Sequence, residues 1–153
     1  MSTLEDILAE HPLFSGLDPR YLQLTAACAS DVHYREGDVL FRQGDQANNF
    51  YLIRQGKIAL ELSAPGRGSL TVQTLEDGEI LGYSWLIPPH YYKFDGRAVT
   101  ATHAIILDGA WLRAKCEEDH ELGYQLMSRI ASILGHSLAA TRFRLLDVYG
   151  SGA

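Results

Sequence analysis

The sequence predicts a mainly β domain, an antiparallel sandwich or barrel, with helices at both ends. Glycines punctuate the central part of the chain, and short apolar runs lie between them at spacings of about ten residues, which is typical of a small β domain. Apolar residues at helical spacing precede and follow this region. The 153 residues suffice for one domain with a substantial core. The glycines of the central part lie at positions 37, 44, 56, 66, 68, 78 and 82.

We expect residues 1–30 to form a helical entry to the domain. Apolar residues from Leu4 to Leu8 recur at helical spacing, and the His11-Pro12 pair ends that first helix. A second helix follows, with Asp18 as its N-cap and Pro19 at its first position.

The β region is expected over residues 31–108. Its residues form short strand-like runs rather than helical patterns, and the turns between them contain glycine. The predicted strands cover residues 39–41, 50–54, 57–62, 70–75 and 97–108.

Helical spacing returns over residues 109–149, where the pattern predicts a short helix and a long amphipathic helix. A helix running unbroken from residue 121 to residue 149 would be about 40 Å long and would project past a small β domain. Its apolar stripe then needs a cover, and we expect a homodimer through this helix. Alternatively, the helix folds back at Gly135 onto its own domain. Residues 150–153 are expected to form a loose tail. The residues expected at the dimer interface are Leu126, Met127, Ile130, Leu134, Leu138, Thr141 and Leu145.

Three stretches make the chain resemble the cyclic-nucleotide-binding-domain superfamily, to which the catabolite activator proteins belong. "HPLFSGL" resembles the entry motif of the family, and "YREGDVLFRQGDQANNFYLIRQGKIAL" resembles its first hairpins, with glycines 37, 44 and 56 at turn positions. "LDGAWLRAKCEEDHELGYQLMSRIASIL" resembles the short helix and the dimerisation helix that follow. The resemblance implies a double-stranded β-helix, or jelly roll, with N-terminal helices and a long C-terminal helix.

The resemblance also implies an altered phosphate-binding cassette over residues 78–98. Family members that bind cAMP or cGMP have Gly-Glu-x-Phe-Gly-Glu, a short helix, and then an arginine that neutralises the cyclic phosphate. Residues 78–84 read "GEILGYS", so Tyr83 replaces the carboxylate that holds the ribose, and Asp95 aligns with the arginine. Binding of cAMP or cGMP in the usual way is therefore not expected.

An alternative keeps nucleotide binding through Arg97. This residue lies two positions after Asp95, and residues two apart on a strand share a face. Arg97 could then point into the pocket and bind the phosphate, although Asp95 would share that face and could pair with it.

The aromatic stretch around Pro88-Pro89 has two interpretations. Its rings either fill the cavity, which gives a ligand-free scaffold, or line a pocket for a different small ligand, anionic or nucleotide-like, oriented by Arg97, His90 or Tyr83. The candidate pocket residues are Leu81, Gly82, Tyr83, Ser84, Trp85, His90, Tyr91, Tyr92, Phe94, Asp95, Arg97 and Ala98.

Composition and missing motifs argue against other functions. The net charge is −6 and no stretch concentrates Lys and Arg, so DNA binding by this chain is not expected. The chain also ends at Ala153, where the connection to a helix-turn-helix domain would begin in the activators. No apolar run is long enough for a membrane helix, and the acidic amphipathic start is unlike a secretory signal, so we expect a cytoplasmic protein.

Catalytic and metal-binding motifs are missing as well. The histidines form neither His-x-His nor HExxH, and there is no nucleophile elbow or P-loop. We therefore expect no enzyme, no metal and no cofactor. The sequence favours a sensory or regulatory module that binds a small ligand other than cAMP or cGMP, or a protein partner.

Overall fold

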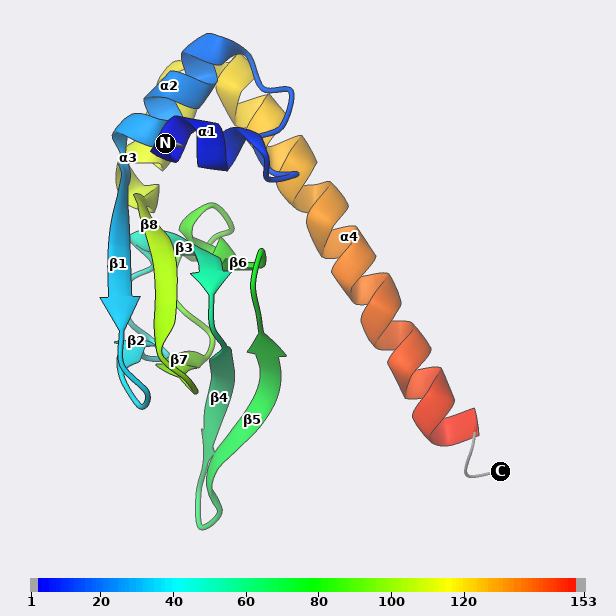
Figure 1. The fold of residues 1–153 in the computed structure, drawn as a ribbon. Helices are drawn as coiled ribbons and strands as arrows, with labels where there is room; N and C mark the ends of the chain where they lie inside the picture. Colours follow the sequence, from blue (N-terminus) through cyan, green and yellow to red (C-terminus); the bar gives the residue numbers. More distant parts are fainter. Residues whose placement is uncertain (1–2, 151–153) are drawn as a thin grey trace.

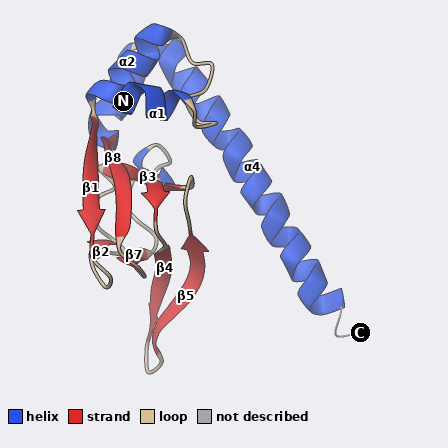
Figure 2. Ribbon diagram, in the orientation of Figure 1, coloured by secondary structure: helices blue, strands red, loops and turns tan. Residues whose placement is uncertain are grey.

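The computed structural model describes residues 3–150, with side chains through residue 147. Two four-stranded antiparallel sheets pack against each other, helices cover one end, and a long C-terminal helix runs away from the sheets (Figure 1). This arrangement confirms the jelly roll with flanking helices (Figure 2). No helix in the described part of the chain has the length and hydropathy needed to cross a bilayer.

Two short helices begin the chain. In α1 (Leu4–Ala9), the Thr3 hydroxyl accepts a hydrogen bond from the Asp6 amide, and the Asp6 carboxylate accepts one from the Thr3 amide, forming a capping box. In α2 (Pro19–Ala27), the Asp18 carboxylate accepts from the Arg20 amide at 2.9 Å, as the predicted N-cap requires. Met1 and Ser2 of the predicted helical entry lie outside the described residues.

The first sheet has the strand order β1-β8-β3-β6 and the second has the order β2-β7-β4-β5. The core between the sheets contains apolar side chains from both, so the sheets bury their facing sides together. The first sheet consists of β1 (Ala29–Tyr34), β8 (Thr102–Asp108), β3 (Asn49–Gln55) and β6 (Ile80–Leu81). The second consists of β2 (Val39–Phe41), β7 (Asp95–Ala98), β4 (Ile58–Ala64) and β5 (Gly68–Leu75).

The single strand expected over residues 97–108 is wrong. The chain forms β7 and β8 there, in different sheets, and leaves the strand conformation between them at residues 99–101. Space is tight at this crossing: a Cβ on Gly56, whose φ is +125°, would lie 2.4 Å from the Thr102 hydroxyl oxygen. Glycine is therefore required there both for its backbone angle and for its small size.

Two helices end the chain. In α3 (Gly109–Glu118), the Asp108 carboxylate accepts from the Trp111 amide at 3.0 Å. The Asp119 carboxylate accepts from the Leu122 amide at the start of α4 (His120–Gly150). The 31 residues of α4 pass through Gly135 without a break, so the helix does not fold back onto its own domain. Gly150 ends α4, and residues 151–153 of the expected tail lie outside the described residues.

The apolar stripe of α4 serves two purposes. Leu122, Leu126 and Ile130 are at most 1 % exposed and pack in the core of this chain, so Leu126 and Ile130 are not free to meet a partner as expected. Every residue from 135 to 147 is exposed. The second half of the helix therefore has an uncovered apolar row, which includes Leu138 and Leu145.

Candidate ligand-binding site

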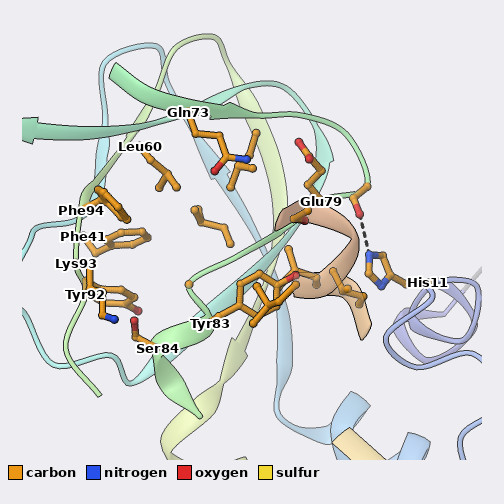
Figure 3. A pocket seen from close by; sticks show the side chains of 18 of the residues that line it. His11, Phe41, Leu60, Gln73, Glu79, Tyr83, Ser84, Tyr92, Lys93 and Phe94 are labelled. Carbon is orange, nitrogen blue, oxygen red and sulfur yellow. Dashed lines mark hydrogen bonds between the residues drawn. The ribbon is translucent and has the colours of Figure 1, made fainter. Parts of the chain in front are cut away.

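A cavity of about 410 Å³ lies between the roll and α4 (Figure 3). Its walls come from the N-terminal turn at residues 11–12, from strands of the second sheet, from the two segments at residues 78–84 and 92–94, and from one stretch of α4 at residues 133–137. This volume lies within the range of small-molecule sites in proteins.

The structure places half of the candidate pocket residues in the cavity wall. Those in the wall are Leu81, Gly82, Tyr83, Ser84, Tyr92 and Phe94. Those outside the wall are Trp85, His90, Tyr91, Asp95, Arg97 and Ala98.

Trp85 is a core residue and not part of the pocket. It is 0 % exposed, and its ring stacks on Phe50 with centroids 4.5 Å apart and planes 10° apart. A Cβ on Gly109 would lie 2.6 Å from the Trp85 Cβ, so α3 starts directly against this side chain. The largest ring of the aromatic stretch thus connects the roll to α3.

Tyr92 and its neighbours form a wall without filling the space. The Tyr92 ring stacks on Phe41 with centroids 3.9 Å apart, and its hydroxyl donates to the Asn49 carbonyl at 2.5 Å. Tyr91 is 47 % exposed, and His90 donates from Nδ1 to the Ser84 carbonyl, 3.0 Å away. Because the cavity stays open, the interpretation that the rings fill it is wrong.

Arg97 and Asp95 lie on the side of β7 that faces away from the cavity. Gly96 and Ala98 are buried, and the alternation of the strand turns the other two residues outward. Asp95 accepts from the Gln43 amide at 2.7 Å. The two residues do share a face, but Arg97 pairs with Glu61 and not with Asp95. The structure therefore does not place Arg97 where the alternative with a bound phosphate needs it.

The pair between Arg97 and Glu61 satisfies both side chains. Arg97 donates from Nε and Nη2 to the two carboxylate oxygens of Glu61, each at 2.9 Å, and Thr71 donates to the same carboxylate at 3.4 Å. The hydrogen bonds from Arg97 lower the pKa of Glu61, and those to Glu61 raise the pKa of Arg97. Such a bidentate pair fixes the guanidinium group on the outer face.

The polar groups of the cavity are few and lie on different sides. Lys93 and Ser84 lie together on one side, while Glu79 lies on the other (Figure 3). Burial raises the pKa of Tyr83 to about 12, so its hydroxyl is neutral at physiological pH. Lys93 forms no ion pair or hydrogen bond with any of the described residues. It is the one Lys or Arg in the described cavity wall.

The cassette turn keeps its shape through Gly82. Its φ is +93°, and a Cβ there would lie 3.3 Å from the Asn49 carbonyl oxygen and 3.4 Å from the Tyr92 ring. Only glycine combines this backbone angle with so close an approach. The frame of the cassette is thus retained while its charged groups have changed.

Most of the remaining wall was missed from the sequence. Four of these residues lie within the cassette stretch itself, and the others come from the N-terminal turn, the second sheet and α4, which are distant from it in sequence. One signal was available in the sequence: Leu134 lies on the apolar stripe of α4, and this residue packs against the core in the structure. The missed residues are His11, Pro12, Phe41, Leu60, Gln73, Leu75, Gly78, Glu79, Ile80, Lys93, Ile133 and Ser137, together with Leu134, which was assigned to the dimer interface.

A metal site is not formed by the described residues, which contain no group of three or more His, Cys, Asp or Glu side chains placed to hold an ion.

Residues 31–119 match the family model of the cyclic nucleotide-binding domain. The chain is 39 % identical over 83 residues to the cAMP-dependent protein kinase regulatory subunit of Schizosaccharomyces pombe, a match that covers 54 % of this chain and 19 % of that protein. It is 28 % identical over 135 residues to the cyclic AMP receptor protein of Thermus thermophilus, covering 88 % of this chain and 57 % of that protein. The chain thus spans less than two thirds of the length of these curated relatives.

Solved structures of similar proteins also superpose on this chain. A protein of Geobacter metallireducens GS-15 superposes with a TM-score of 0.80 at 28 % identity, covering 90 % of this chain and 99 % of that one. The catabolite activator protein of Thermus thermophilus superposes with a TM-score of 0.67 at 25 % identity, covering 88 % of this chain and 61 % of that one. The family match over more than half of the chain, supported by this fold, shows that the chain belongs to the cyclic nucleotide-binding domain family of regulatory domains.

Proposed function

We propose that this domain is a regulatory module whose cavity binds a small molecule, and that it does not bind cAMP or cGMP through the contacts usual in its family. The pairing of Arg97 with Glu61 outside the cavity is the observation that carries this proposal. It removes the guanidinium group that a cyclic phosphate requires.

The other residues of the cavity wall are a weak substitute for an arginine that binds a phosphate. A buried phosphate needs a paired cation and several hydrogen bonds, and a bidentate arginine provides both. Lys93 supplies a point charge on a flexible exposed stem, which does not reproduce a planar fork of donors. Tyr83 supplies a neutral hydroxyl where the family has a carboxylate for the ribose. Neither of the two charged contacts of the usual cassette is therefore available.

The wall favours a ligand with a ring or another flat apolar body. The stacked pair of Phe41 and Tyr92 forms an apolar face, and Leu60 and Leu75 continue it. The ammonium group of Lys93 at one side suits an anionic group on the ligand. A small anionic or nucleotide-like molecule is thus the ligand class that fits.

In this proposal, α4 connects the cavity to the self-association of the domain. Ile133, Leu134 and Ser137 line the cavity, and the exposed apolar row with Leu138 and Leu145 starts directly after them. We infer that a second copy covers this row, because an exposed row on a projecting helix is stabilised by a matching helix. A ligand that contacts residues 133–137 would then change how the two α4 helices pack. Ligand binding in the cavity would therefore change the affinity of the two copies for each other.

Fluorescence of N-phenyl-1-naphthylamine, an uncharged dye that emits in apolar sites, tests whether the cavity accepts a ligand. Leu60→Trp, which places a large ring in the cavity, should abolish dye binding. Leu62→Trp is the matched control, because Leu62 lies two residues along the same strand and does not line the cavity. Dye bound to the wild-type domain should resist displacement by cAMP or cGMP at about 1 mM. Equal binding to both tryptophan variants, or displacement by micromolar nucleotide, would overturn the proposal.

A further inference from the structure

His11 joins the N-terminal turn to the cassette across the cavity wall. Its Nε2 lies 2.7 Å from the carbonyl oxygen of Gly78, a residue 67 positions further along the chain (Figure 3). On the other side of the ring, Nδ1 lies 3.0 Å from the Leu13 amide nitrogen. Both His11 and Gly78 line the cavity, so this ring closes part of its wall.

These two contacts determine where the ring holds its proton. The Leu13 amide only donates, so Nδ1 must accept and is unprotonated. The Gly78 carbonyl only accepts, so Nε2 must carry the hydrogen. The observed geometry therefore belongs to neutral His11. A second proton would go onto Nδ1, and two N–H groups would then face each other at a distance of 3.0 Å.

The residues around His11 do little to stabilise its protonated, positively charged form. Burial lowers the pKa of His11, and the Gly78 carbonyl opposes that effect in part. The titratable groups that share the cavity wall with His11 are Glu79, Tyr83 and Lys93, and Glu79 already accepts from the Glu76 amide at 2.6 Å.

The acidic residues of α1 and its C-cap, Glu5, Asp6 and Glu10, form no ion pair with His11. The side chains that α4 adds to the cavity wall, Ile133, Leu134 and Ser137, are uncharged. Arg129 of the same helix donates to the Ser15 carbonyl and adds positive charge near the turn. Among the described residues no ion pair involves His11.

We propose that His11 is a positioning residue for the cavity: its neutral ring holds the N-terminal turn against the cassette, and its protonation releases this wall and weakens ligand binding. This inference rests on the proposed function, since it assigns the regulation of the same cavity. The site would bind its ligand more tightly at neutral pH than at mildly acidic pH. Histidine is the side chain suited to such a response in this range.

The pH range follows from the direction of the pKa shift. The ordinary pKa of histidine is 6.5, and the value in the folded domain lies below it. The unfolded or released turn therefore binds the proton more readily than the closed wall does. The closed wall is fully stabilised above pH 6.5 and loses this stabilisation as the pH falls through 6.5 towards the lower folded value.

Dye binding as a function of pH tests the inference with three variants. N-phenyl-1-naphthylamine stays uncharged between about pH 8 and about pH 5, so a change in its affinity reports the protein. The wild-type domain should lose affinity about fivefold or more over this range. His11→Gln should bind with near wild-type affinity at neutral pH and lose the pH dependence, because its amide can still donate to Gly78 and does not titrate. His11→Asn, which is too short to reach Gly78, should bind weakly at every pH.

A histidine distant from the cavity provides the control. His120→Gln removes an exposed histidine and should leave the wild-type pH profile unchanged. Parallel pH profiles for the wild-type domain and His11→Gln would overturn the inference while leaving the proposed cavity intact.

Hydrogen exchange at the Leu13 amide gives a second readout that needs no ligand. Its protection in the wild-type domain should fall between neutral and mildly acidic pH, after correction for the intrinsic exchange rate, relative to the Phe14 amide, which donates to the His11 carbonyl. Unchanged relative protection would contradict the inference even if the dye did not bind. Loss of protection without any dye binding would uphold the role of His11 and refute the proposed cavity function.

Discussion

Arg97 and Glu61 form a bidentate pair on the outer face of the second sheet, with both nitrogen–oxygen distances at 2.9 Å. Glu61 lies on β4 and Arg97 on the neighbouring strand β7, where Arg97 is aligned with Ala59, two positions before Glu61. The arginine is thus neutralised by a strand neighbour that faces away from the cavity. The resemblance to members that bind a cyclic nucleotide implies an arginine that points at the phosphate, whereas Arg97 points away from the cavity.

Substitutions of Arg97 and of Glu61 should lower the stability of the domain by different amounts. The Glu61 side chain is 10 % exposed and the Arg97 side chain is 38 % exposed. Arg97→Ala leaves a nearly buried carboxylate without its main partner, whereas Glu61→Gln leaves a cation that water can still reach. We expect Arg97→Ala to lower the thermal midpoint by a few degrees and Glu61→Gln to lower it less. Thermal unfolding of the two variants at neutral pH measures this difference.

Acidic pH should remove the contribution of the Arg97–Glu61 pair to the free energy of unfolding. The pKa of Glu61 is lowered below its ordinary value of 4.5, mainly by hydrogen bonds from Arg97. The stabilisation is therefore present above pH 4.5 and is lost as the pH falls through the lower folded value. The difference in unfolding free energy between the wild-type domain and Glu61→Gln should narrow in that range. A constant difference down to strongly acidic pH would contradict this assignment.

Trp85 should affect stability and not ligand binding. Its side chain is 0 % exposed and lies outside the cavity wall. Trp85→Ala should cost about 3–5 kcal/mol in the free energy of unfolding, as for other buried large rings. At a temperature where the variant stays folded, its affinity for N-phenyl-1-naphthylamine should match that of the wild-type domain. A large gain in dye binding would show instead that Trp85 limits the cavity.

Association should depend on one side of α4. Leu138 and Leu145 are 52 % and 50 % exposed and lie seven residues apart, on the same side of the helix. Leu138→Glu should weaken self-association about tenfold or more, because it places a charge in an apolar interface. Sedimentation at several protein concentrations gives the dissociation constant.

A matched charge on the opposite side of the helix provides the control for this prediction. Ala140 lies roughly 200° around the helix axis from Leu138 and is also exposed. Ala140→Glu adds the same charge and should leave association near the wild-type value. Equal effects of the two substitutions would indicate a general charge effect and would argue against the proposed interface.

Much of the fold could be read from local patterns. Turn glycines delimited the strands, Asp18 and Pro19 marked the start of α2, and α4 followed from a long proline-free stretch with apolar residues at helical spacing. The division of residues 97–108 between two sheets had no local signal, because no glycine or proline interrupts this stretch. The crossing is set by tertiary pairing, with β7 in the second sheet and β8 in the first.

The site was harder to predict because its residues come from distant segments. Gly82 and Tyr83, two of the candidate pocket residues, lie in the cavity wall next to each other because they belong to one turn. The orientation of Arg97 depended on the pleat of β7 and on a carboxylate from another strand, which no spacing within residues 78–98 reveals. His11 gave no signal of its own, because its contact with Gly78 spans 67 residues.

The most direct test of the central claim is calorimetric titration of the purified domain with cAMP and with cGMP. The claim predicts no heat of binding with either nucleotide at about 1 mM, in the wild-type domain and in Arg97→Ala alike. Micromolar binding by the wild-type domain that is lost in Arg97→Ala would contradict it. That result would mean that Arg97 leaves Glu61 and turns into the cavity when a cyclic phosphate is present.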